Sequence, residues 1–252
     1  MTAAVLAPPT AVSRVAPSGA PVELTLPAAF GEFRWYATAR FSGPHLARQF
    51  FLAPAREHRV VPTHVMPGAR EHRVPMRGFD AVVFEAADRS DATLVLVGPY
   101  HEATTWFGGP APNPAGLTAM LDAFRFTDSP QGATLVPVSD LLVKQSDVTL
   151  IGRGPSSTLV VRRSVDLLAA LPEWAGMRLP GGELWRARRL LGEDQQSLVA
   201  GTPHEWRFLL GSETAVMDLV FRGPESGRPA LEMSENELVE ALGQLSAKWV
   251  QA

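Results

Sequence analysis

The chain has 252 residues, of which 46% are hydrophobic and 19% are charged, and its formal net charge is -3. This composition excludes wholesale disorder and allows one large domain or two small ones. The slightly negative charge is atypical of general nucleic-acid-binding proteins, which are usually strongly basic. The chain contains no cysteine, which excludes disulfides, thiolate metal ligands and a cysteine nucleophile.

The sequence contains no predicted membrane-spanning helix, because such a helix needs about 18 consecutive apolar residues. Residues 1–20 are rich in alanine and proline and lack the basic start of a signal peptide, so we expect a flexible arm. A cytoplasmic location is consistent with both features. Arginine supplies nearly all of the positive charge, since Lys144 and Lys248 are the only lysines. This bias is typical of bacteria with GC-rich genomes, such as actinobacteria.

Two strands are predicted near the start of the chain, at residues 22–26 and 33–41, and residues 44–51 form either a helical turn or another strand. The sequence Ala-Arg-Glu-His-Arg-Val then occurs twice, at residues 55–60 and 69–74. If both copies are strands, they form a polar hairpin that the surrounding prolines confine to a sheet edge.

The most regular stretch begins at Gly78. Apolar runs at residues 79–86 and 92–98 flank a polar turn, which predicts a β-hairpin. A loop rich in proline and glycine follows. Residues 115–124 then carry one apolar stripe at helical spacing, which predicts a helix that covers the hairpin. The stripe consists of Leu117, Met120, Leu121 and Phe124.

A turn-rich break at residues 128–132 predicts the boundary between two α+β halves, at residues 21–128 and 133–252, after the arm at residues 1–20. The second half is predicted to contain a strand at 134–143, a hairpin at 148–151 and 158–161, a helix at 165–174, a strand at 184–191, a hairpin at 205–210 and 215–221, and a final helix at 235–250. Ser234 and Glu237 form a capping box before that helix.

The two halves end alike. Residues 91–99 resemble residues 215–224, because each run ends in Gly-Pro and is followed by a polar loop and a helix. This likeness favours an internal duplication, although strand, loop and helix is also a common order. We therefore predict an α+β fold of antiparallel sheets covered by helices, with two similar half-domains packed as a pseudo-twofold unit.

Residues 78–83, the strand that ends at Gly98 and residues 117–126 together resemble the end of a PsbP-like domain. The resemblance implies an α/β/α sandwich, with an antiparallel sheet between helices. It also implies a non-catalytic binding or assembly role, and it identifies no catalytic residue.

Five of the six histidines lie in the first half, at His45, His58, His64, His72 and His101. With nearby glutamates they could supply ligands for zinc, iron or manganese. No familiar metal signature matches their spacing, so solvated polar strands are the preferred interpretation and the metal is left open. No cofactor is predicted.

Arginines cluster between residues 56 and 77, and guanidinium groups suit phosphate or carboxylate recognition. A solvated face or a protein contact remains the preferred interpretation, because arginine is the usual cation of this sequence. The candidate ligand-binding residues are Arg56, His58, Arg59, Arg70, His72, Arg73, His101 and Trp106. The tryptophans at 174, 185, 206 and 249 are assigned to the core, with interface anchoring as the alternative.

The preferred function is a non-catalytic binding, assembly or adaptor protein that acts through a protein partner surface or as a homo-oligomer. The alternative is an enzyme, or a protein that binds an anionic ligand or a metal through residues 56–77 and the loop at 99–109. No catalytic residue is predicted. Nucleic-acid binding is a weaker hypothesis, and it predicts an affinity that falls steeply with salt.

Overall fold

A computed structural model describes residues 7–44, 47–139, 143–167, 171–227, 230 and 233–250. The described residues divide into two compact units. Unit 1 contains residues 7–14, 21–35 and those from 150 to 250, and unit 2 contains residues 15–20 and 36–149.

Unit 2 is built around antiparallel strands in the order β3-β4-β8-β7-β6-β5. The strands of this part are β3 (Arg34–Ser42), β4 (Ala47–Pro54), β5 (Arg70–Pro75), β6 (Asp80–Glu85), β7 (Ala92–Val97) and β8 (His101–Phe107). Helix α1 (Pro114–Asp122) and the hairpin of β9 (Phe124–Ser129) and β10 (Gly132–Pro137) follow. The short helical segments η2 (Glu57–Val60) and η3 (Val61–Val65) connect β4 to β5.

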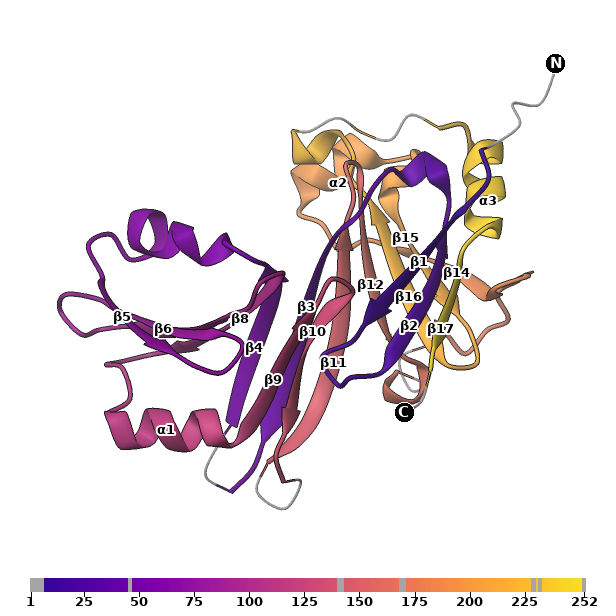
Figure 1. Cartoon of the computed structure of the whole chain (residues 1–252). Coiled ribbons are helices and arrows are strands. Elements are labelled where there is room, and N and C mark those ends of the chain that lie inside the picture. Colours follow the sequence, from indigo (N-terminus) through magenta and orange to yellow (C-terminus); the bar gives the residue numbers. More distant parts are fainter. Residues whose placement is uncertain are drawn as a thin grey trace. The chain divides into compact units, whose positions relative to one another are not determined.

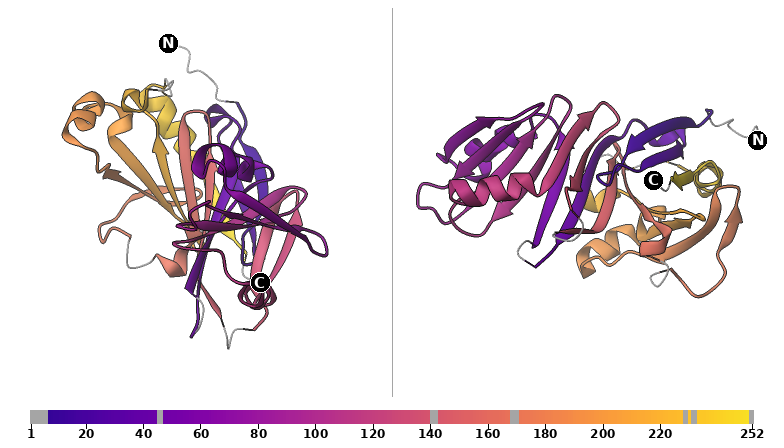
Figure 2. Two further views of the ribbon diagram at one scale, coloured as in Figure 1. Left: turned by 90° about the vertical axis from the view of Figure 1, so that its left-hand side faces the viewer. Right: turned by 60° about the horizontal axis from the view of Figure 1, so that its bottom comes forward.

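Each face of the outer strands of unit 2 is covered differently. Figure 1 shows η2 and η3 on one side of β5, β6 and β8 and α1 on the other, and the right-hand view of Figure 2 shows α1 in magenta beside the same strands. The core under η2 and η3 consists of Val61, Met66, Val82, Phe84 and Val95. The side facing α1 is less completely filled, and a groove remains there.

Unit 1 repeats this strand arrangement, in the order β11-β12-β16-β15-β14-β13. Its strands are β12 (Ser157–Arg163), β13 (Met177–Leu179), β14 (Gly182–Arg188), β15 (Trp206–Gly211), β16 (Ala215–Phe221) and the end of β11 (Lys144–Arg153), whose residues up to 149 belong to unit 2. Helices α2 (Glu193–Val199) and α3 (Glu235–Gly243) also belong to it. A small sheet has the order β1-β2-β17 and contains β1 (Thr10–Val15), β2 (Pro21–Leu26) and β17 (Ser246–Trp249).

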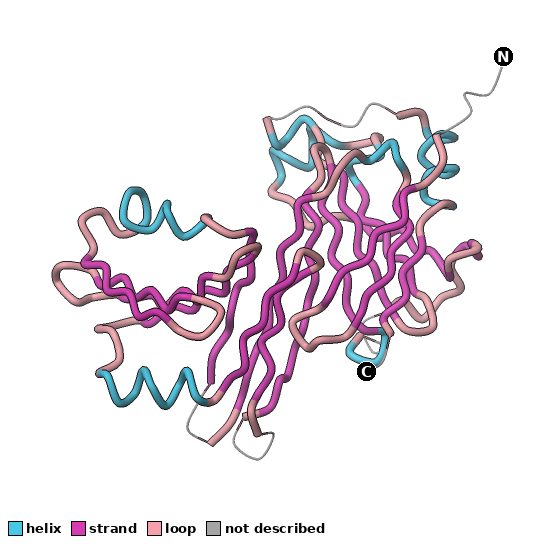
Figure 3. Tube along the Cα trace, in the orientation of Figure 1, coloured by secondary structure: helices cyan, strands magenta, loops and turns pink. Residues whose placement is uncertain are grey.

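The predicted fold class, an α+β fold in which helices cover the sheets, is wrong. Among the described residues, 47% are in strands and 20% are in helices, and the sheets are antiparallel (Figure 3). In the described residues, a twelve-stranded sheet has the order β13-β14-β15-β16-β12-β11-β3-β4-β8-β7-β6-β5. Helices α1 and α3 have nine residues each, about two and a half turns, which is too short to cover such a sheet.

The first to sixth strands of one unit occupy the same places in the strand order as the first to sixth strands of the other. The registers of the corresponding hairpins β7–β8 and β15–β16 also match. Leu94 pairs with Thr105 in the β7–β8 hairpin, and Phe208 pairs with Leu219 in the β15–β16 hairpin. The second strand of each hairpin, β8 or β16, ends two residues after Thr105 or Leu219 at a buried phenylalanine. This phenylalanine begins the sequence Phe-Gly-Gly-Pro in β8 and Phe-Arg-Gly-Pro in β16. In both units a helix follows, and a strand comes directly after the helix.

The strands that follow α1 and α3 have partners at very different distances in the sequence. In unit 2, β9 pairs with β10, which is the next strand in the sequence. In unit 1, β17 pairs with β2, which lies near the start of the chain. The buried Trp249 of β17 is opposite Val22 of β2 and anchors this pairing in the core.

Several predicted elements are confirmed. The hairpin at residues 79–98 is β6–β7, and the predicted hairpins of the second half are β11–β12 and β15–β16. The predicted helix at 115–124 is α1, and residues 44–51 belong mostly to the strand β4. The capping box of Ser234 and Glu237 is present at the start of α3.

Two element predictions are wrong, and so is the conditional interpretation that both copies of Ala-Arg-Glu-His-Arg-Val are strands. The first Ala-Arg-Glu-His-Arg-Val copy forms a turn and η2, because the buried carboxylate of Glu102 accepts hydrogen bonds from the backbone N–H groups of Arg56 and His58. The helix predicted at residues 165–174 is only the short turn η4 (Ser164–Asp166) in the described residues, and residues 168–170 lie outside them. The final helix ends at Gly243, and β17 follows it.

In the part of the chain that the structure describes, the helices lack the length and apolar character that a membrane-spanning helix needs.

Candidate functional site

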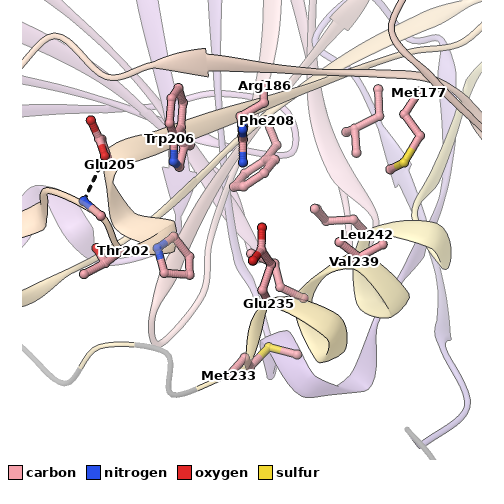
Figure 4. A pocket seen from close by; sticks show the side chains of 14 residues that line it. Met177, Arg186, Thr202, Glu205, Trp206, Phe208, Met233, Glu235, Val239 and Leu242 are labelled. Carbon is pink, nitrogen blue, oxygen red and sulfur yellow. Dashed lines mark hydrogen bonds between the residues drawn. The ribbon is translucent and has the colours of Figure 1, made fainter.

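A groove lies between α3 and the strands β13, β14 and β15, entirely within unit 1. This α3 groove has a volume of about 530 Å³ and is lined by Met177, Leu184, Arg186, Phe208, Val239 and Leu242, among others (Figure 4). The volume falls within the range of about 300–1,000 Å³ typical of small-molecule sites. Its walls are mainly apolar, so water in the groove gains few hydrogen bonds.

A second groove occupies the corresponding place in unit 2. This α1 groove has a volume of about 540 Å³ and lies between α1 and the hairpin of β5 and β6. Its lining includes Arg70, His72, Val74, Val83 and Glu85. Arg70 is opposite Glu85 in the ladder and His72 is opposite Val83, so these side chains share one face of the hairpin.

The two helices use the same positions to form the two grooves. The first, fourth, fifth and eighth residues of each helix line its groove. These residues are Pro114, Leu117, Thr118 and Leu121 in α1, and Glu235, Leu238, Val239 and Leu242 in α3. Such spacing presents one face of a helix, so the two helices turn the corresponding face toward their grooves.

Local sequence fixes where each helix starts. The side chain of Asn113 accepts a hydrogen bond from the backbone N–H of Gly116 at 2.8 Å, and Pro114 takes the first helical position. In α3, Ser234 accepts from the backbone N–H of Glu237, whose carboxylate accepts from the backbone N–H of Ser234. Each cap satisfies backbone groups that would otherwise lack partners at the entrance to a groove.

Arg186 and Trp206 form one wall of the α3 groove. The guanidinium carbon of Arg186 lies 4.4 Å from the centroid of the Trp206 ring, which is a cation–π distance. Arg186 is directly opposite Phe208 in the β14–β15 ladder, so Trp206 is its diagonal neighbour. Strand pairing therefore creates this contact between residues that are distant in the sequence.

Glu205 is a buried carboxylate at the end of the groove. It accepts hydrogen bonds from the backbone N–H of Gly201 at 3.0 Å and from the guanidinium group of Arg188. The Gly201 bond is the largest cause that lowers the pKa of Glu205 below its ordinary value, and Arg188 is the next. This ionised carboxylate holds the wall of the groove in place.

The two candidate histidines of the sequence analysis at positions 58 and 101 are each tied to a carboxylate. The Nδ1 atom of His58 lies 2.6 Å from Glu102, and both side chains are buried. The Nδ1 atom of His101 lies 2.8 Å from Asp128, which also accepts from the backbone N–H groups of Tyr100 and His101. These contacts tie two turns of unit 2 to its sheet.

The structure separates the candidate residues of β5. Arg70 and His72 line the α1 groove, whereas Arg73 forms exposed ion pairs with Glu71 and Asp80, each at 3.1 Å. The alternation of side chains along a strand accounts for this separation.

The remaining candidates are exposed and lie on different elements. Arg56 precedes η2 in a left-handed conformation with φ of 81°, and Arg59 is within η2. Trp106 is 38% exposed on β8. Among the described residues, no group of three or more histidine, aspartate or glutamate side chains is arranged to hold a metal ion. His45 lies outside the described residues.

Sequence reasoning missed Arg186 and Glu235 and assigned Trp206 to the core. The confirmed capping box locates Glu235 at the start of α3, but nothing local in the sequence indicates that Arg186 reaches Trp206. The core assignment holds for Trp185 and Trp249, which are buried, whereas Trp174 is 63% exposed.

Comparisons with known proteins gave no match to a family model, a curated protein or a solved structure.

Proposed function

We propose that this chain is a non-catalytic binding protein that holds an apolar ligand in the α3 groove. The observation that carries the proposal is the recurrence of a groove of nearly equal volume at the same helix positions in both units. Protein interiors are normally close-packed, so unfilled space between a helix and a sheet loses dispersion contacts. Recurrence with different lining residues supports a binding role rather than an accident of packing.

We also infer that the two units arose by internal duplication. The corresponding strand orders, the matched registers of two hairpins and the Phe-x-Gly-Pro sequences at the ends of β8 and β16 support this inference. The likeness of residues 91–99 to residues 215–224 aligns β7 with β16. The strand order of the structure instead aligns β7 with β15. Under this inference a binding groove is an inherited feature of each repeat.

Titration with the neutral apolar dye Nile red tests the binding role. Val239 is 45% exposed and lines the α3 groove, so Val239→Trp fills the groove without disturbing the core. We expect this variant to lose most of the dye fluorescence due to the α3 groove. Thr118→Trp is the equivalent change in α1 and should remove the signal of the α1 groove.

Glu240→Trp is the matched control, because Glu240 is exposed on the same helix and does not line the groove. It should bind Nile red as the unaltered protein does. If Val239→Trp binds the dye as well as Glu240→Trp does, the α3 groove is not a binding site for apolar molecules.

A second candidate is an adaptor that acts through a protein partner surface. Large exposed apolar side chains in unit 1 favour it, namely Trp174, Leu190 and Leu198. Mass spectrometry of proteins that co-purify with the tagged full-length chain should then find a stoichiometric partner. If the Trp174→Ser and Leu190→Ser variants still bind that partner, these two side chains are not part of the partner surface.

The cytoplasmic location and the PsbP-like resemblance of residues 78–127 stay predictions. The alternative, an enzyme or a protein that binds an anionic ligand or a metal through residues 56–77 and the loop at 99–109, also stays a prediction. The structural separation of Arg70 from Arg73 gives that alternative less support than the grooves give to ligand binding.

A further inference from the structure

The polar side chains of the α3 groove differ in whether the protein already satisfies them. Glu205 is engaged by Gly201 and Arg188, and the hydroxyl of Thr202 donates to the backbone carbonyl of Val199 at 2.7 Å. Arg186 and Glu235 form no ion pair or hydrogen bond within the described residues, although the charge of Arg186 contributes to the lowered pKa of Glu205. Two charges of opposite sign are therefore left available to a ligand.

Arg186 is held in place while its hydrogen-bond donors remain available. Its guanidinium group stacks on Trp206, which restricts its position but leaves the N–H groups at its edge free. The other arginines nearby are paired, since Arg188 binds Glu205 and Arg189 binds Glu225 at 2.8 Å. An unpaired guanidinium group at the wall of an apolar groove suits a carboxylate.

Glu235 faces the groove from the opposite wall. It is the first residue of α3, but the capping role there belongs to Ser234 and Glu237, so Glu235 is not needed to start the helix. Figure 4 shows Arg186 on the strand wall and Glu235 on the helix wall, with their charged ends turned toward each other across the groove. A free carboxylate in this position suits an ammonium group.

The space between these charges is apolar. Leu184 and Phe208 line it from the strands, and Leu238 and Leu242 line it from α3. We propose that the α3 groove binds an apolar zwitterion, with its carboxylate on Arg186, its ammonium group on Glu235 and its apolar body between them. A short apolar peptide with free termini has this chemistry. This inference rests on the proposed binding function and specifies its ligand.

The α1 groove provides a comparison within the same molecule. In unit 1, Leu184 pairs with Met177, and Arg186 lies two residues after Leu184. In unit 2, the corresponding pair is Ala81 and Val74, and Val83 lies two residues after Ala81. Val83 therefore takes the place of Arg186, and Pro114 takes the place of Glu235. The α1 groove lacks charges at these two positions, and its own Glu85 already accepts from Arg89 and from the backbone N–H of Ala111 and faces the charge of Arg70. We therefore expect zwitterion binding in the α3 groove alone.

Calorimetric titration with the dipeptide leucyl-phenylalanine and its two blocked forms tests the proposal. The dipeptide with free ends should bind the unaltered protein about fivefold to tenfold more tightly than either the N-acetylated or the C-amidated form. Arg186→Gln should weaken binding of the free dipeptide by a similar factor and leave binding of the amidated form unchanged. Glu235→Gln should also weaken binding of the free dipeptide, and it should leave binding of the N-acetylated form unchanged.

Both substitutions lie at exposed positions, so circular dichroism should report an unchanged fold. Failure of the free dipeptide to bind at millimolar concentration overturns the proposal, and so does equal binding of the free and blocked forms. If Val239→Trp still abolishes Nile red binding in the α3 groove, the binding function stands without the zwitterion. If Val239→Trp leaves dye binding intact, the binding function itself is wrong.

Discussion

Buried carboxylates organise this protein at the scale of single residues. Glu102 is 1% exposed and accepts hydrogen bonds from two backbone N–H groups and from the ring of His58. Asp128 accepts hydrogen bonds from the backbone N–H groups of Tyr100 and His101 and contacts the ring of His101. Two of the three histidines that the sequence offers as ligand-binding candidates, His58 and His101, thus have structural contacts, and their partners lie far away in the sequence.

Glu102→Gln should destabilise unit 2 by about 2–4 kcal/mol, because the amide cannot satisfy all three donors that the carboxylate accepts from. Urea denaturation measures this loss. Glu71→Gln is the control, because it removes an exposed ion pair with Arg73 that is worth about 1 kcal/mol or less. Equal losses in the two variants would show that Glu102 does not organise the turn.

His204 predicts a pH dependence of stability in unit 1. Burial is the largest cause that lowers the pKa of His204 below its ordinary value of 6.5, and the charge of Glu225 opposes that shift. The folded state therefore favours the neutral ring, whereas the unfolded chain takes up a proton below pH 6.5. The stability due to this residue is present above that pH and is lost as the pH falls.

Thermal denaturation at pH 7.5 and 5.5 checks this dependence (about one pH unit on either side of that value). The unaltered protein should lose more stability on acidification than His204→Gln does. Parallel losses in the two proteins would assign the pH dependence to other groups.

At the scale of elements, the repeated Ala-Arg-Glu-His-Arg-Val sequence shows how strongly tertiary contacts override local preference. The first copy is a turn and a short helix, and the second copy is the edge strand β5. Sequence periodicity correctly predicts the hairpins and α1, because their apolar residues lie on one face. It cannot distinguish two identical hexapeptides, since the difference arises from Glu102, which belongs to β8.

The two copies should respond in opposite ways to glycine. Arg56 has a φ of 81°, a conformation that glycine adopts without strain, so Arg56→Gly should stabilise the protein by about 0.5–1 kcal/mol. Arg70→Gly lies within a strand and should destabilise it by about 0.5–1 kcal/mol. Urea midpoints provide the comparison. A shift of the same sign for both variants would contradict the left-handed turn at Arg56.

At the scale of the whole molecule, the compact units do not follow the order of the chain. The predicted break at residues 128–132 contains the turn of the β9–β10 hairpin inside unit 2. The pairing of β2 with β17 brings together the two ends of the described chain, and no local pattern in the sequence indicates it. The grooves were missed for a related reason, because each is formed by a helix and strands that only the topology brings together.

A fragment of residues 36–149 should therefore fold by itself, because it contains β4 to β10, α1 and most of β3. A fragment of residues 21–128 should fold poorly, since it lacks the strand that pairs with β9 and contains β2 without β17. Cooperative thermal unfolding followed by circular dichroism distinguishes the two. Cooperative unfolding of only the second fragment would contradict this division of the chain.

The most direct test of ligand binding is chemical-shift mapping by NMR on the isotopically labelled full-length protein, with leucyl-phenylalanine as the ligand. We predict chemical-shift changes concentrated on β14, β15 and α3, including the indole N–H of Trp206, and little change around α1. Shifts around α1 alone, shifts scattered over both units, or none at millimolar dipeptide would contradict it.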